Sequence, residues 1–172
     1  MRVKIHCKKF DTEFKMALYG MVEFTMARLV ESKRLRTNLS IDVHFRHHSA
    51  EGEAMIDSHA NPYRPREFRV IIDHHRLEVD NYGRTREVTE WAHEVLKTLA
   101  HELVHVKQYV VGDLSIRSKG MYWKGELTKI DNMMEYFKSP WEIEAYGLER
   151  YLWLNFIDFW KSNVEKHLEE KE

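Results

Sequence analysis

The residues from 101 to 105, His101-Glu102-Leu103-Val104-His105, form the pattern HExxH. Side chains four residues apart on an α-helix lie one turn apart on the same face, so both imidazoles can bind one metal ion. Glu102 lies beside them, where a carboxylate can accept a proton from a metal-bound water. In a chain with 11 histidines the pattern arises by chance about 0.08 times. The spacing therefore indicates a metal site with His101 and His105 as ligands and Glu102 as general base.

The surroundings of the motif strengthen this interpretation. It lies in the most apolar helical stretch of the chain, TLAHELVHV at residues 98–106. A polar group buried without a partner costs about 2–7 kcal/mol, and a metal ion with its water would supply such partners. The alternative is that the three side chains lie at the surface or are hydrogen-bonded internally, and it leaves their apolar setting unexplained.

A catalytic zinc site needs a third protein ligand and one open position. Cys7 is the only cysteine and precedes the motif, and no histidine follows the motif until His167. We therefore expect a carboxylate from a second helix. The acidic candidates are Glu126, Asp131, Glu135, Glu142, Glu144 and Glu149.

The segment SPWEIEAYG at residues 139–147 favours Glu142 among these candidates. A carboxylate in the first turn of a helix suits the helix dipole, and Ala145 is small enough to let two helices approach closely. Glu144 points about 200° away from Glu142, so only one of them can face the ion. Glu142 is the predicted third ligand and Glu144 its rival.

The elements that must position these residues follow from periodicity. Apolar spacing predicts helices over residues 12–35, 86–111 and 140 to about 167, with Asp11, Gly112 and Ser139 at their ends. Alternating or β-branched residues predict strands at 39–45, 53–57 and 68–73, and short connections favour antiparallel pairing. A hairpin or loop is expected near 121–125. The predicted fold is α+β, a single domain over 1–172 with a small three-stranded, mostly antiparallel sheet.

Composition excludes several classes of protein. The chain has 27 basic and 28 acidic residues, so no global positive field favours nucleic acid as a partner. The longest apolar stretch, residues 151–160, is too short to cross a bilayer, and the N-terminal residues lack the apolar core of a secretory signal. We expect a cytoplasmic protein that does not bind membranes. The nine other histidines are expected to be incidental, and the oligomeric state stays open.

HELVH followed by a helix that reads WEIEAY resembles the gluzincin branch of the zincin metallopeptidases. The chain is similar to small phage-encoded proteins of this type and, loosely, to SprT-like proteins, although those use a third histidine soon after HExxH. The resemblance implies a zincin-like fold with one catalytic Zn²⁺ held by His101, His105 and Glu142, and Ala145 matches the Ala of the family's ExxAD helix. Tyr146 stands where many members have Asp, so the residue that orients a ligand histidine is not identified.

The resemblance also implies a zinc-dependent peptidase acting on a peptide or protein. Zinc lowers the pKa of its water toward about 7, and Glu102 accepts the proton and delivers it to the leaving amine. In zincins the substrate lies along the exposed edge strand, expected here at 68–73. The candidate oxyanion donors are Tyr109, Tyr122, Tyr136 and Tyr146.

Two other functions are compatible with the same residues. One is a catalytically silent zincin-like module that binds metal or a protein, and the other is a hydrolase that acts on a bond other than a peptide. The presence of Glu102 favours an enzyme.

Overall fold

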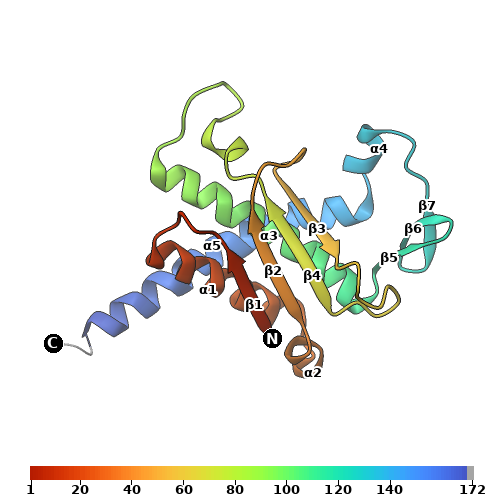
Figure 1. Cartoon of the computed structure of the whole chain (residues 1–172), viewed down its shortest axis with the longest axis horizontal. Helices are drawn as coiled ribbons and strands as arrows, with labels where there is room; N and C mark the ends of the chain where they lie inside the picture. The colour runs from red at the N-terminus through yellow and green to blue at the C-terminus, as the bar shows by residue number, and fades with distance from the viewer. Residues whose placement is uncertain (170–172) are drawn as a thin grey trace.

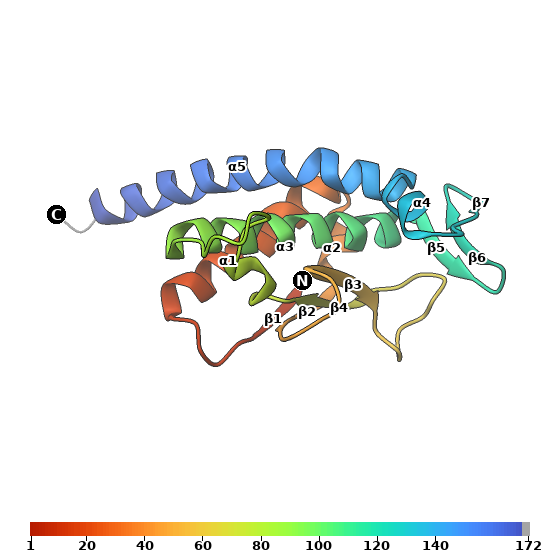
Figure 2. The ribbon, with the colours of Figure 1, turned by 90° about the horizontal axis from the view of Figure 1, so that it is seen from above.

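The helices and the larger sheet form successive layers. The computed structural model describes residues 1–169, with side chains described through residue 163. A four-stranded sheet lies on one side, α1 (Thr12–Leu29) and α3 (Val88–Val111) pack against it, and α5 (Pro140–Glu169) covers those helices (Figure 1, Figure 2). α3 is thus enclosed between the sheet and α5, as its apolar sequence requires.

The four-stranded sheet is mixed. It contains β1 (Arg2–His6), β2 (Ser40–Phe45), β3 (Gly52–Ile56) and β4 (Glu67–Ile72) in the order β1-β2-β4-β3. β1, β2 and β4 are parallel, and only β3 is antiparallel to its neighbour. The α+β class is confirmed, but the prediction of a three-stranded, mostly antiparallel sheet is wrong. A helical crossover through α1 returns the chain parallel to β1, a strand the sequence prediction missed.

The edge strand next to the HExxH helix is β3, so the prediction that residues 68–73 form the exposed edge is wrong. β4 lies between β2 and β3. Its Val70, Ile71 and Ile72 are all fully buried, and a continuous β-branched run of this kind is typical of an internal strand.

The predicted helix over 12–35 is two helices. Asp11 caps α1 as expected, but the chain becomes extended at Val30. α2 (Lys33–Thr37) then begins, and the Arg36 guanidinium donates to the carbonyl oxygen of Val30. That bond satisfies a carbonyl group at the end of α1, which lets the helix end there.

α3 and α5 follow the predictions closely. α3 begins with a capping box between Glu87 and Glu90 and ends at Gly112, whose φ of 87° is left-handed. α5 begins at Pro140 as predicted, but its predicted side-chain cap is not formed, because Ser139 Oγ has no hydrogen-bond partner among the described residues.

The segment between α3 and α5 is more regular than predicted. A second, antiparallel sheet contains β5 (Leu114–Arg117), β6 (Gly120–Trp123) and β7 (Glu126–Thr128), and α4 (Met133–Phe137) follows it. The predicted hairpin is present, with Lys124 and Gly125 both at positive φ in its turn. Before α3, the short 3-10 helix η1 (Arg76–Glu78) follows β4.

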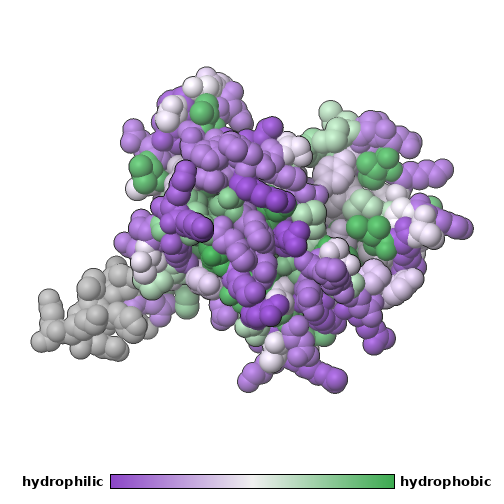
Figure 3. All heavy atoms as spheres, viewed as in Figure 1, coloured by the Kyte–Doolittle hydropathy of each residue, from purple (hydrophilic) through white to green (hydrophobic). Residues whose placement is uncertain are grey.

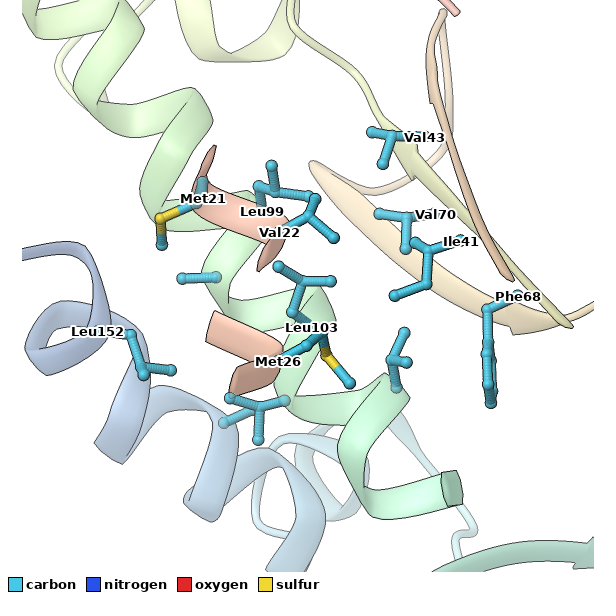
Figure 4. Close-up of a cluster of buried hydrophobic side chains, with 14 of the residues drawn as sticks. Met21, Val22, Met26, Ile41, Val43, Phe68, Val70, Leu99, Leu103 and Leu152 are labelled. Atoms are coloured by element: carbon cyan, nitrogen blue, oxygen red, sulfur yellow. The ribbon is translucent and has the colours of Figure 1, made fainter. Parts of the chain in front are cut away.

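One hydrophobic core joins the layers. Figure 4 shows residues of α1, the sheet, α3 and α5 pointing toward one another, and each is at most 2% exposed. They are Met21, Val22, Met26, Ile41, Val43, Phe68, Val70, Leu99, Leu103 and Leu152. This core fixes α3 against α5. Within residues 1–169, no helix is both long and apolar enough to cross a membrane.

Candidate metal centre

Three side chains from two adjacent helices converge at the HExxH motif. α3 supplies His101 and His105, and the first turn of α5 supplies Glu142, while the fully buried Ala145 lets the helices lie close together. The two carboxylate oxygens of Glu142 lie 3.3 Å from the Nε2 atoms of His101 and His105, respectively. Those two Nε2 atoms are 3.2 Å apart. All three residues are less than 9% exposed.

The outer nitrogens of the two imidazoles are held by acceptors. His101 Nδ1 lies 2.9 Å from Glu149 Oε2, and His105 Nδ1 lies 2.9 Å from Gln108 Oε1. A carboxylate or amide oxygen can only accept, so each Nδ1 carries a hydrogen and each Nε2 faces the centre of the cluster. Two Nε2 atoms 3.2 Å apart repel each other unless a cation or proton lies between them.

Gln108 connects the histidine helix to the glutamate helix. It is fully buried, and its Nε2 donates to Trp141 O at 2.9 Å and to Glu144 Oε2 at 2.8 Å. Lys107 Nζ in turn pairs with Glu144 Oε1 at 3.0 Å. Glu144, the predicted rival ligand, therefore lies outside the cluster and supports Gln108.

The charges of the cluster are strongly coupled. Burial by itself would raise the pKa of Glu142, but hydrogen bonds from His101 and His105 hold it well below its usual range. Burial would lower the pKa of His101, but Glu142 and Glu149 raise it to about 9. These carboxylates make the centre of the cluster a favourable place for positive charge.

Glu102 lies beside the cluster, 5% exposed, against the edge strand. Burial raises the pKa of its carboxyl to about 7, although the two histidines oppose the rise. A Cβ placed on Gly52 of β3 would lie 2.5 Å from Glu102 Oε1, so only glycine leaves room for this carboxylate. The edge strand and the candidate general base are therefore in direct contact.

Two of the four predicted tyrosines stand at the site. Burial, and then the hydrogen-bonded Glu142 carboxylate, raises the pKa of the Tyr136 hydroxyl. The ring of Tyr146 packs edge-on against His101, with centroids 4.6 Å apart. The ring of Tyr109 is buried against Phe68, and the ring of Tyr122 lies under Arg117. Tyr136, carried by α4, is the better-placed donor.

The donor set fits a zinc ion. Ligands about 2.0–2.1 Å from a tetrahedral ion stand about 3.3 Å from one another, and the three separations in the cluster are 3.2–3.3 Å. Glu142 Oε1 is buried and accepts no well-aligned hydrogen bond from the described residues. Two histidines and one glutamate are also a set that leaves one position open for water or substrate.

Of the six acidic candidates, only Glu142 joins the two histidines in a group whose ligand atoms all lie within 4.8 Å of one another. Glu149 was predicted only as a possible ligand, and no role was predicted for Gln108 or Gly52. Helical spacing could have found the first two, because Glu149 lies seven residues after Glu142 and Gln108 seven after His101.

Comparison of the chain with protein-family models, with curated proteins and with solved structures finds no match.

Proposed function

We propose that the protein is a zinc-dependent peptidase with a zincin-like arrangement of helix, sheet and glutamate helix. The observation that carries the proposal is the convergence of the two imidazole Nε2 atoms, 3.2 Å apart, on the buried Glu142 carboxylate. A divalent cation between these three groups would satisfy all of them, and the buried Glu102 carboxyl lies beside the cluster. This combination supports hydrolysis better than a purely structural metal site, since a structural site needs no adjacent base.

His101, His105 and Glu142 would hold the ion, and zinc bound there supplies Lewis-acid polarisation of a carbonyl and a more acidic water. Glu102 is the group that would take up a proton and return it to the leaving amine. The Tyr136 hydroxyl, kept protonated by its raised pKa, would donate to the oxygen that becomes negative in the transition state in place of its bond to Glu142.

The proposed substrate is a peptide or protein segment in an extended conformation. β3 pairs with β4 on one side only, so its other edge offers backbone donors and acceptors to a further strand. Gly52 lets the face of this strand pack directly against Glu102. A peptide added there would pass the base and the metal ligands.

The test compares metal content and peptide cleavage for the wild type, Glu102→Gln and Glu142→Ala. Glu102→Gln should retain zinc and lose about 10²–10⁴-fold in kcat/KM, the usual contribution of a general base. Glu142→Ala should bind zinc at least about 100-fold more weakly, since even residues that merely support ligands contribute about 10–100-fold. Glu94→Gln, on a part-exposed turn of the same helix, is the matched control and should change neither quantity.

Each alternative function has its own outcome. A wild type that holds zinc but cleaves no peptide, and behaves like Glu102→Gln, would be the silent metal-binding module. Cleavage of ester or amide substrates without peptide turnover would indicate the non-peptidase hydrolase. A wild type that cannot be loaded with zinc at all overturns the proposal.

A further inference from the structure

A second group of metal-binding side chains lies on the opposite face of the sheet from the helices. The strand register places His6 of β1 directly opposite His44 of β2, and Asp42 lies two residues before His44 on the same face of β2. One ligand atom from each of the three lies within 4.8 Å of the others. This group is separate from the HExxH site, because α3 packs against the inner face of the sheet.

That outer face is partly open to solvent: the His6 and Asp42 side chains are 43% and 29% exposed, whereas Ile71, the register partner of His44, is fully buried. The inner positions Val3, Ile5, Ile41 and Val43 pack toward the helices, so the alternate positions point away from them. The sheet lies in front of α3 in Figure 1, and from the same side Figure 3 shows mostly hydrophilic side chains over these strands. An ion from solution can reach the group directly.

Two atoms of the group already lie at a separation that fits two ligands of one ion. His6 Nε2 lies 3.4 Å from Asp42 Oδ2, close to the separation of about 3.3 Å between ligands of tetrahedral zinc. The other oxygen, Asp42 Oδ1, is buried and has no hydrogen-bond partner in the described part of the chain. That oxygen is an unused acceptor next to two imidazoles.

The two imidazoles stack with their centroids 4.1 Å apart and their planes 4° from parallel. The nitrogen lone pair of an imidazole lies in the plane of its ring, so two stacked parallel rings do not point at one ion, and one ring must turn for both to bind it. The His6 side chain is 43% exposed and has room to turn, and the χ2 angle of histidine is broad.

Positive charges also face this group and limit its affinity. Lys4 of β1 and Arg69 of β4 are the register partners of Asp42 on either side of β2, and Arg46 follows His44 by two residues. Arg69 is paired with Asp57 at 3.1 Å, which offsets part of its charge. The group is therefore expected to bind zinc more weakly than the HExxH cluster, whose nearest charged neighbours are carboxylates.

We propose that His6, Asp42 and His44 form a second zinc site that fastens the N-terminal edge strand to the sheet. β1 pairs with β2 alone, and the chain between His6 and His44 runs through α1 and α2. An ion held by both strands closes that long connection, and binding to the folded state alone stabilises it by mass action. The site has a structural role and takes no part in hydrolysis.

The experiment counts zinc ions by calorimetric titration of the full chain. The wild type should bind two ions, and His44→Gln should bind one, with the amides of residues 2–6 exchanging hydrogen faster than in the zinc-loaded wild type. His59→Gln removes an exposed histidine away from both groups and should still bind two ions. His6→Gln, at an exposed position, repeats the test if circular dichroism shows that His44→Gln does not fold.

Different results would overturn the proposed site at His44 and the proposed site at the HExxH motif. If His44→Gln and the wild type bind the same number of ions, or if His59→Gln also loses one, the second site is wrong. A wild type that binds one ion, lost in His44→Gln but kept in His101→Ala, would support the second site and overturn the first. Peptide cleavage that survives in His44→Gln supports the structural role, and its loss in a folded variant contradicts it.

Discussion

The candidate metal centre uses side chains that lie at helical spacing on one face of α3. His101 and His105 point inward, and Gln108, one turn further on, holds the second imidazole by its outer nitrogen. From α5, Glu142 faces the centre, and Glu149 holds the first imidazole. Each candidate ligand histidine therefore has a partner that fixes which nitrogen is free, and the partner of His105 is an amide rather than a carboxylate.

Gln108→Leu should weaken zinc binding by about 10–100-fold, because His105 then loses the acceptor that fixes its orientation. The same change also breaks the bonds from Gln108 to Trp141 O and Glu144 that tie α3 to α5. Competition with a chromogenic chelator measures the affinity. Glu149→Gln keeps an acceptor oxygen for His101 and should show a smaller loss. Equal affinity for Gln108→Leu and the wild type would contradict this role.

Gly52→Ala should lower kcat/KM by at least about tenfold while zinc affinity stays unchanged, since the added methyl group displaces the Glu102 carboxylate but touches no candidate ligand. Steady-state kinetics and a zinc titration of the same preparation separate the two effects. Gly147→Ala is the matched control, because a Cβ at that position meets nothing within 4 Å. A Gly52→Ala variant as active as Gly147→Ala would show that the close contact does not position the base.

The sequence predicts the site residues that share one helix, but it does not predict those brought in by the packing of separate elements. His101, Glu102 and His105 come from one helix, so a fixed period of residues brings them together. Glu142 required a guess about which face of a second helix meets the first, and the chain does not encode that choice locally. Gly52 was unpredictable, since its contact with Glu102 depends on how a distant strand packs.

At the scale of elements, the helices were predicted better than the sheet. The 3.6-residue period and end signals gave α3 and α5 nearly in full, whereas strand order depends on pairing between remote segments. Val3 and Ile5 alternate with Arg2 and Lys4, so a pattern for β1 was present in the first residues. Once β1 is included, a helical crossover to β2 favours parallel pairing, and the antiparallel prediction loses its basis.

α5 depends on its buried face to hold Glu142 and Glu149 against α3. Leu152→Ala should destabilise the protein by about 2–5 kcal/mol, because Leu152 is 1% exposed and its removal leaves a cavity between the helices. Leu154→Ala, at a position that is 44% exposed on the same helix, should change stability far less. Urea unfolding monitored by circular dichroism gives both values. Similar losses for the two variants would mean that α5 is not anchored by this face.

For the whole molecule, a buried carboxylate makes stability depend on pH. Asp73, 1% exposed, follows β4 and accepts hydrogen bonds from the backbone N–H groups of His48, His75 and Arg76. Burial would raise the pKa of this carboxyl, but those bonds, with the nearby His47 and Arg76 side chains, hold it below its usual value. The ionised Asp73 carboxylate, just after β4, thus holds the segment that follows β2.

Because the pKa of Asp73 is lower in the folded than in the unfolded state, its contribution is complete above the unfolded value of about 3.9 and is lost as pH falls through the folded pKa. Asp73→Asn should therefore reduce the free energy of unfolding by about 1–3 kcal/mol at pH 7, the cost of weakening charge-assisted bonds to a buried group. The difference from the wild type should shrink as the pH is lowered below about 4. Urea titrations of metal-free protein at several pH values measure it. Asp158→Asn, on the exposed side of α5, is the control and should show no such dependence on pH. If the difference in free energy of unfolding between Asp73→Asn and the wild type persists in acid, the ionised carboxylate is not its source.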